Sequence, residues 1–274
     1  MSIAPFDGNA LEVLSALFPE SSKNTLRSWL ERGRVTVDGQ VAKKASAPIK
    51  KGQNVILGHR KEILDRSIEV LYEDEHLVVI MKPEGVLSVA TDFQTRGTAH
   101  DILKRRFHAG RVYPVHRLDR ETSGVMVFAY TQKAKEYFET LFFEHTILRS
   151  YVALVEGIVE KPKGTYESFL KEDDHCVVHS TSENYGKHAV THFEVLSKKG
   201  KYSLVRFVLE TGRKNQIRVH CKEAGHPIAG DIKYCALTNP IKRLALHAEK
   251  LGFVHPTNKK DLLFQTPIPE EFIL

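Results

Sequence analysis

A run of nine residues from His116 to Gly124 constrains this chain more than any other stretch. It reads His-Arg-Leu-Asp-Arg-Glu-Thr-Ser-Gly and lies between two apolar segments, Val112–Val115 and Val125–Tyr130. A segment that only reverses the chain needs a glycine or an aspartate, and not this density of ionisable and hydroxyl side chains. The run therefore predicts a polar loop that leads into a buried strand and carries chemistry.

Length, charge and cysteine content narrow the class of protein. The 274 residues suffice for one medium-sized domain and a small second one. The net charge is +6, and residues 1–60 hold nine Lys or Arg against five Asp or Glu, so nucleic acid is the first partner to expect. The three cysteines form no CxxC pair, and no apolar run approaches the roughly 18–20 residues of a membrane span. We expect a soluble, cytoplasmic protein without a membrane partner.

The first 60 residues have the pattern of two short helices followed by a basic β-hairpin. A first helix is expected after Asn9, which can cap it, and a second between Ser22 and Gly33. Strands are expected at 34–37 and 54–57, with a hairpin turn at Asp38-Gly39 after the first of them. This unit is compact, and residues 58–67 after it lack a periodic apolar face, as a linker does.

From Ile68 the pattern becomes strand-rich. Strands are expected at Ile68–Tyr72, Leu77–Met81, Gly124–Tyr130, Tyr151–Glu156, Val190–Leu196 and Tyr202–Glu210. Helices are expected at Ala99–Phe107, Lys133–Phe143 and Asn215–Ala224. Because the order is not a regular βαβ alternation, the pattern predicts an α+β fold with a mixed, largely antiparallel sheet and helices packed outside it.

The run from His116 to Gly124 resembles the catalytic signature of the RluA-type RNA pseudouridine synthases, in which the aspartate attacks the uridine. The resemblance implies that Asp119 is the catalytic carboxylate, which can act as a nucleophile or stabilise positive charge. It also places Arg117 beside the flipped nucleotide, with His116 as a further candidate contact to the RNA. Asp119 is compatible with three routes for breaking the glycosidic bond: attack at C1′, attack at C6, and formation of a glycal.

Two further blocks resemble the same family. In residues 149–157, Tyr151 stands where the family has a tyrosine that stacks on the target base, and Arg149 replaces the usual lysine. In residues 209–220, Arg218 is implied to pair with Asp119, which its planar fork could bind bidentately.

The second of these blocks contains a departure from the family, because Asn215 stands where histidine is more usual. Arg213 stands just before the helix expected at Asn215–Ala224 and is a candidate phosphate contact. Downstream, the resemblance implies that Leu246 packs against the active-site tyrosine. The resemblance spans about residues 68–274.

The segment from Ser22 to Gly39 resembles the αL RNA-binding module that a small-subunit ribosomal protein shares with many RNA-modifying enzymes. The cations at the matching positions are Lys23, Arg27, Arg32 and Arg34. Phosphate contacts of this kind supply affinity and orientation rather than sequence specificity. We therefore expect an RNA-binding domain at 1–60, a linker at 61–67 and a catalytic domain at 68–274.

Together these residues predict a monomeric pseudouridine synthase that acts on structured RNA, with ribosomal RNA of the large subunit favoured over tRNA. A non-catalytic RNA-binding or assembly protein on the same fold is the alternative. A glycosidase that uses Asp119 with Glu121 is disfavoured, since carboxyls two residues apart in a turn rarely converge on one bond. The 14 histidines include no metal-binding motif, and no phosphate-cradling glycine loop occurs, so we expect no metal and no cofactor.

Overall fold

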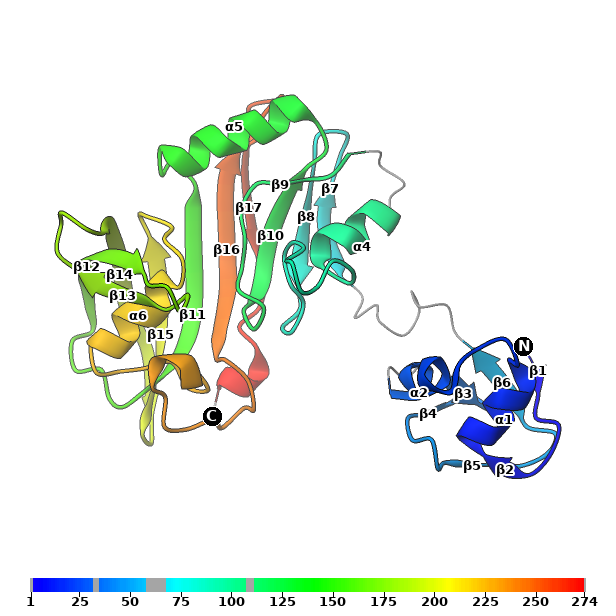
Figure 1. The fold of residues 1–274 in the computed structure, drawn as a ribbon. Coiled ribbons are helices and arrows are strands. Elements are labelled where there is room, and N and C mark those ends of the chain that lie inside the picture. The colour runs from blue at the N-terminus through cyan, green and yellow to red at the C-terminus, as the bar shows by residue number, and fades with distance from the viewer. Residues whose placement is uncertain (1, 32–34, 58–67, 107–110, 274) are drawn as a thin grey trace. The chain divides into compact units, whose positions relative to one another are not determined.

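The computed structural model describes residues 2–31, 35–57, 68–106 and 111–273 (Figure 1). The chain divides into two compact units, Met1–Ser67 and Ile68–Leu274. Each unit has its own apolar core, and each is considered by itself below.

In the first unit, two helices pack on short strands. Asn9 caps α1 (Ala10–Leu17) as predicted, since its side chain accepts from the amide of Glu12 and the Glu12 carboxylate accepts from the amide of Asn9. Helix α2 (Lys23–Glu31) follows Ser22, whose hydroxyl accepts from the amide of Thr25. The strands are β1 (Ser2–Ile3), β2 (Gly8–Asn9), β3 (Val35–Val37), β4 (Gln40–Ala42), β5 (Pro48–Ile49) and β6 (Asn54–Leu57).

The predicted hairpin between β3 and β4 is present. Asp38 and Gly39 form its turn with φ values of 47° and 83°, as a tight two-residue hairpin turn requires. The Asp38 carboxylate also accepts from the amide of Asn54, and this bond lowers the pKa of Asp38. The hairpin belongs to a four-stranded sheet with the order β1-β6-β3-β4.

The second unit is built on one large sheet, with the strand order β13-β12-β14-β15-β11-β16-β10-β8-β7 and two additional strands, β17 on β16 and β9 on β10. Its strands are β7 (Glu69–Glu73), β8 (Leu77–Lys82), β9 (Tyr113–Pro114), β10 (Ser123–Ala129), β11 (Leu148–Glu156), β12 (Lys163–Glu172), β13 (Val178–Thr181), β14 (Lys187–Lys199), β15 (Tyr202–Leu209), β16 (Leu246–Val254) and β17 (Asp261–Gln265). Among the described strands, β10 and β16 are the only parallel neighbours. The predicted mixed, largely antiparallel sheet is confirmed.

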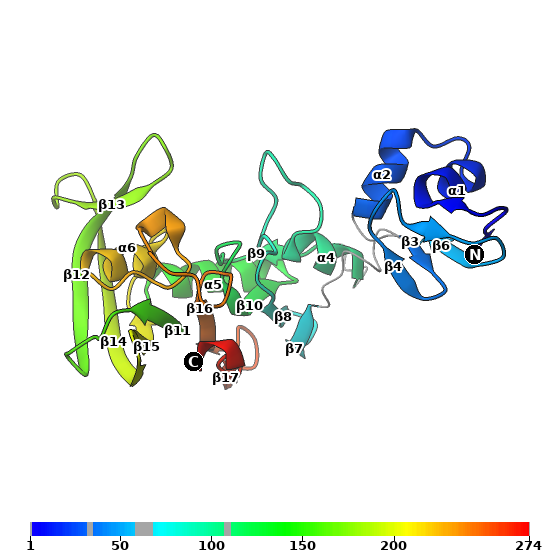
Figure 2. The same ribbon diagram turned by 90° about the horizontal axis from the view of Figure 1, so that it is seen from below.

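Helices cover this sheet at three places: α4 (Ala99–Arg106), α5 (Gln132–Phe143) and α6 (Gln216–Glu223) (Figures 1 and 2). Strand β10 is buried along its whole length, because α4 shares an apolar cluster with one of its faces and α5 with the other. Successive side chains of a strand point to opposite faces, so Met126 and Phe128 belong to the α4 side and Val125 and Val127 to the α5 side.

Strand β10 begins where it meets β16, and this junction requires a glycine. Gly124 has a φ of 121°, and a Cβ atom there would lie 2.2 Å from the carbonyl oxygen of Ala248. Only a residue without a side chain allows the two backbones this approach. The end of the nine-residue run is thereby fixed against β16.

Five strands of the second unit are absent from the sequence-based prediction: β9, β12, β13, β16 and β17. Strand β12 alternates between exposed and half-buried residues, and its side chains are mostly polar, so it lacks a strong apolar pattern. Strand β16 is almost wholly buried but contains His247 and Glu249, which interrupt its apolar run. Both polar residues have partners in the interior, since His247 contacts the hydroxyls of Ser123 and Thr266, and Glu249 binds Arg206.

Candidate active site

A cavity of about 470 Å³ lies where the nine-residue run faces the start of α6, with β11 and the end of α5 completing its wall. All seven site residues predicted for the second domain line it: His116, Arg117, Asp119, Tyr151, Arg213, Arg218 and Leu246. They come from segments up to about 130 residues apart in the sequence. The fold therefore brings the predicted residues together in one place.

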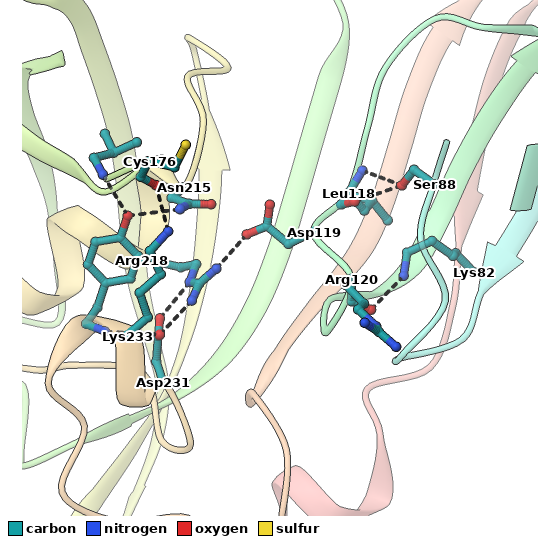
Figure 3. A network of polar contacts seen from close by, with 12 residues as sticks. Lys82, Ser88, Leu118, Asp119, Arg120, Cys176, Asn215, Arg218, Asp231 and Lys233 are labelled. Carbon is teal, nitrogen blue, oxygen red and sulfur yellow. Dashed lines mark hydrogen bonds and ion pairs between the residues drawn. The ribbon is translucent and has the colours of Figure 1, made fainter. Parts of the chain in front are cut away.

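Asp119 lies on the loop between β9 and β10, and hydrogen bonds hold this loop on both sides of it. The Ser88 hydroxyl donates to the carbonyl of Leu118 at 2.7 Å and accepts from the Leu118 amide at 3.0 Å (Figure 3). The carbonyl of Arg120 accepts from the Gly85 amide at 2.8 Å and from Lys82 at 3.2 Å. Asp119 is therefore fixed through its two neighbours, while its own side chain remains one-third exposed.

Lys82 is completely buried, and its ammonium group donates to three backbone carbonyls, those of Pro83, Val86 and Arg120. Burial lowers the pKa of Lys82 to about 8, although the negative charges of Glu121 and Asp119 oppose this shift. The protonated form has one N–H for each of the three carbonyls. Lys82 thus joins the start of the β8–α4 connection to the loop that carries Asp119.

On the opposite side of the cavity, α6 presents Arg218 to Asp119. Nη1 of Arg218 donates to Oδ2 of Asp119 at 3.0 Å, so the predicted pair is present in the structure (Figure 3). The prediction that Arg218 binds Asp119 bidentately is wrong, because Arg218 donates to Asp119 through Nη1 only. The guanidinium of Arg218 instead binds Asp231 bidentately, with Nε and Nη2 each 2.7 Å from a different carboxylate oxygen.

Asp231 is a site residue that the sequence did not reveal. It lies in a Gly-Asp turn at the start of the short helix η1 (Ile232–Tyr234), and its side chain is 1% exposed. Burial opposes the charge of Arg218, but the hydrogen bonds and charges of Asp231 and Asp119 raise the pKa of Arg218. The guanidinium carbon also lies 4.9 Å from the centre of the Tyr234 ring. Asp231 and Tyr234 therefore hold Arg218 on the side away from the cavity, and its Nη1 is directed at Asp119.

Tyr151 comes from β11 at a bulge where the pairing with β16 changes register. It is half-buried and packs on the apolar cluster that contains Leu246, in keeping with the predicted contact. Burial raises the pKa of Tyr151, so its phenol is neutral at physiological pH. The cavity wall thus contains an aromatic ring that can face a planar base.

Other predicted residues have different surroundings. His116 stacks on Phe142, with ring centres 5.0 Å apart, and its Nε2 accepts from the Val127 amide at 3.0 Å. Burial and the charge of Arg149 lower the pKa of His116 to about 3, so this imidazole is neutral and accepts a hydrogen bond from the backbone of β10. A contact from His116 to RNA stays a prediction. Arg117 is exposed beside it, as a contact to RNA requires.

The end of α5 adds residues that the sequence analysis did not assign to the site. Phe142, Phe143 and His145 line the cavity, and Phe143 is 85% exposed. Arg149 is buried beside them and donates to the carbonyl of Glu210 at 2.8 Å. An exposed phenylalanine at the C-terminal end of an otherwise amphipathic helix was the available signal. The cavity mouth therefore combines cations with an aromatic side chain.

Three of the remaining predicted cations belong to the described residues: Arg213, Lys23 and Arg27. Arg213 donates through Nε to the carbonyl of His188 at 2.9 Å and borders the cavity. In the first unit, Lys23 and Arg27 are exposed one turn apart on α2. Arg32 and Arg34 lie outside the described residues.

The described residues include no group of three His, Cys, Asp or Glu side chains arranged to hold a metal ion. In the same part of the chain, no helix has both the length and the apolar character to cross a membrane. The site as described consists of protein groups: a carboxylate, a guanidinium held by a second carboxylate, and an aromatic wall.

Comparison with known proteins agrees with this arrangement. The family model of RNA pseudouridylate synthase matches residues 76–223, and that of the S4 domain matches residues 11–55. The chain is 34% identical over 268 residues to the uncharacterized RNA pseudouridine synthase YlyB of Bacillus subtilis, covering 91% of this chain and 87% of that protein. It is 31% identical over 296 residues to the ribosomal large subunit pseudouridine synthase D of Pseudomonas aeruginosa, covering 98% and 92% of the two chains.

The fold of the chain is also similar to that of a solved structure of this family. The human RNA pseudouridylate synthase domain containing 4 protein matches with a TM-score of 0.62 at 26% identity, over 78% of this chain and 92% of that one. The chain therefore belongs to the RNA pseudouridylate synthase family and is an RNA pseudouridine synthase, an isomerase, with an N-terminal S4 domain. The family predicted from the nine-residue run is confirmed.

Proposed function

We propose that this enzyme converts uridine to pseudouridine in ribosomal RNA of the large subunit, with Asp119 as the carboxylate that acts on the flipped nucleoside. The observation that carries the proposal is the Asp119–Arg218 pair in the wall of the cavity, with one-third of the Asp119 side chain accessible. An anion held by a partner that is itself fixed by Asp231 is preorganised for reaction at a single place.

The reaction is an isomerisation, and its atoms balance without a cofactor. The bond between C1′ and N1 breaks, a bond between C1′ and C5 forms, C5 loses a proton and N1 gains one. In this proposal Asp119 initiates the exchange, Arg218 orients the carboxylate, and Tyr151 stacks on the uracil while it turns. His116, Arg117, Arg213 and Leu246 shape the cavity and contact the RNA around the flipped nucleotide.

The RNA target rests on the relatives and on the first unit. The Pseudomonas aeruginosa relative is named for the ribosomal large subunit, and it matches this chain over nearly the full length of both proteins. Residues 1–60 then act as the RNA-binding domain and residues 68–274 as the catalytic domain of a monomeric, cytoplasmic enzyme. Mapping pseudouridines in ribosomal RNA and tRNA of a strain that lacks the gene tests this target. A site lost from tRNA alone would contradict it.

The replacement Asp119→Asn tests the catalytic role. It keeps the size of the side chain but removes the carboxylate, so we expect release of tritium from C5-labelled uridine RNA to fall below the detection limit while RNA affinity stays within about twofold. Glu121→Gln is the matched control, because it makes the same exchange two residues away in the same turn, and it should keep most of the activity. An Asp119→Asn enzyme with one-tenth of the wild-type rate would exclude Asp119 from the role.

The role of α2 in RNA binding is tested in the full-length chain. Replacing Lys23 and Arg27 with alanine removes two proposed phosphate contacts, so the slope of log K against log salt should decrease by about 1.5. Lys50→Ala with Lys51→Ala is the control, since it removes the same charge from an exposed turn of the same unit. An equal change of slope in both double variants would show that only net charge matters.

A further inference from the structure

Asn215 lies in the site, and its side chain has contacts that its position before α6 does not explain. It precedes α6 with a left-handed backbone, φ 53°, and its side chain does not cap this helix. The side chain of Gln216, the first residue of the helix, folds back over the preceding segment, and its Oε1 accepts from the Arg213 amide at 2.9 Å. The Asn215 amide lies between the hydroxyl of Tyr234 and the carboxylate of Asp119. Figure 3 shows the side chain of Asn215 beside Arg218 and turned toward Asp119.

Hydrogen-bond chemistry fixes the orientation of this amide. A carboxylate only accepts, so the Asn215 group that faces Asp119 has to be the nitrogen. In this orientation Nδ2 donates to Oδ2 of Asp119 at 2.9 Å, and Oδ1 of Asn215 accepts from the Tyr234 hydroxyl at 2.9 Å. The Tyr234 oxygen in turn accepts from the Val178 amide at 3.2 Å. Every group in this series has a partner of the right kind.

We infer that Asn215 is a positioning residue, which donates the second hydrogen bond to Asp119 and anchors that carboxylate to buried Tyr234. The inference rests on the proposed role of Asp119. Two donors, Nη1 of Arg218 at 3.0 Å and Nδ2 of Asn215 at 2.9 Å, meet at the same oxygen, Oδ2. Oδ1 has a longer contact of 3.3 Å to the same amide. Oδ1 is therefore the oxygen that acts on the nucleoside.

The second donor is anchored as firmly as the first. Tyr234 is 1% exposed, and it packs in an apolar cluster with Val178 and Val219. Its hydroxyl therefore cannot move without disturbing the contact between α6 and β13. Arg218 lies against the ring of the same tyrosine, so the two donors to Asp119 share one support. A rigid support of this kind fixes the direction of a carboxylate rather than only its charge.

The left-handed backbone offers a competing explanation, since asparagine tolerates positive φ better than most residues. Asn215→Gly separates the two roles, because glycine accepts this backbone but has no amide. If the amide positions Asp119, the single-turnover rate at saturating enzyme should fall about tenfold or more, with RNA affinity and melting temperature nearly unchanged. If only the backbone matters, the glycine variant should keep the wild-type rate, and this result would overturn the inference.

Asn215→Asp provides the second variant. Aspartate has the same shape and also tolerates positive φ, but it presents a carboxylate to Asp119 in place of a donor. Its rate should lie below that of Asn215→Gly, and a rate near the wild type would contradict the inference even if the glycine variant did not fold. The Asp119→Asn measurement keeps the two proposals apart: an inactive Asp119→Asn enzyme beside a fully active Asn215→Gly enzyme would reject the inference alone.

Discussion

Asp119 and Arg218 are held by the two halves of the large sheet in different ways. In the loop half, formed by β7 to β10, Asp119 is positioned by bonds to the backbone of its neighbours, from buried Lys82 and from Ser88. In the helix half, formed by β11 to β15 with α6 and η1, Arg218 is positioned by a charged bond to the buried side chain of Asp231. The difference matches what each group has to do.

A carboxylate that reacts needs its oxygens accessible, so the loop half holds the main chain and leaves the side chain of Asp119 one-third exposed. A guanidinium that only directs the carboxylate can be covered, and Arg218 has an exposed side-chain fraction of 11%. Charge-assisted bonds in a covered place are stronger than those between neutral groups. Arg218 also contacts the Asp119 carboxylate directly, whereas Lys82 and Ser88 bind only the backbone of its neighbours. We therefore expect changes of the supporting residues in the helix half to affect the rate more than changes of those in the loop half.

Among the residues that support Asp119, the largest effect is expected for Arg218→Lys. Lysine keeps the charge, but a single ammonium cannot reach both oxygens of Asp231 and one of Asp119 with the geometry of a planar fork. The single-turnover rate should fall by about two orders of magnitude, while the dissociation constant for RNA changes little. An intact rate with weakened binding would show that Arg218 contacts phosphate instead.

The control for this exchange lies in the same sheet. Arg206 binds buried Glu249 with the same two-pronged geometry, at 2.8 and 3.0 Å, and it does not line the cavity. Arg206→Lys should therefore lower the melting temperature without a comparable loss of rate. Equal losses of rate in both variants would mean that the sheet as a whole, and not the site, is sensitive to the exchange.

In the loop half, Lys82→Met should lower the rate by about tenfold. Three carbonyls lose a donor, and the buried carbonyl of Val86 is left unsatisfied at a cost of about 1–3 kcal/mol, so the variant should also unfold at lower denaturant concentration. Lys104→Met on the exposed side of α4 is the control. A larger loss of rate than in Arg218→Lys would reverse the proposed order of the two halves.

The sequence predicted the loop half better than the helix half. The polar run between two apolar segments located the loop, its buried strand and Asp119, because local pattern and chemistry coincide there. The partner of Arg218 was beyond such reasoning: Asp231 lies in an ordinary Gly-Asp turn, and only the folded chain brings it to Arg218. The polar residues inside β16 likewise concealed a buried strand, since their partners come from distant segments.

Ser88→Ala should have a smaller effect in the loop half. The hydroxyl satisfies both the amide and the carbonyl of Leu118, so its removal should destabilise the fold by about 1–3 kcal/mol. The rate should decrease about threefold at most, because Lys82 and Gly85 still hold the loop at Arg120. Chemical denaturation and single-turnover kinetics measure the two effects. A tenfold loss of rate would mean that Ser88 is the main support of Asp119.

The smallest effect on the rate at neutral pH is expected for His220→Gln. This variant tests instead whether the helix half or the loop half contributes more to the loss of stability at acidic pH. Each half has a buried neutral histidine: burial lowers the pKa of His116 to about 3 and that of His220 to about 4. His220 contacts the hydroxyls of Ser168 and Thr191, and glutamine can keep one of these contacts. The rate at pH 7 should therefore stay within about twofold of the wild type.

The sign of the pH dependence follows from proton uptake. The folded protein binds fewer protons than the unfolded chain wherever a histidine pKa is lowered, so these residues stabilise the fold above about pH 6.5 and cease to do so as the pH falls toward 4. Removing His220 should reduce the dependence of the unfolding free energy by about 1.4 kcal/mol per pH unit between pH 6 and 5. Urea titrations at several pH values measure this slope. An unchanged slope would mean that the imidazole of His220 is already protonated in the folded enzyme, and His116 in the loop half would then be the main acid-sensitive group of the pair.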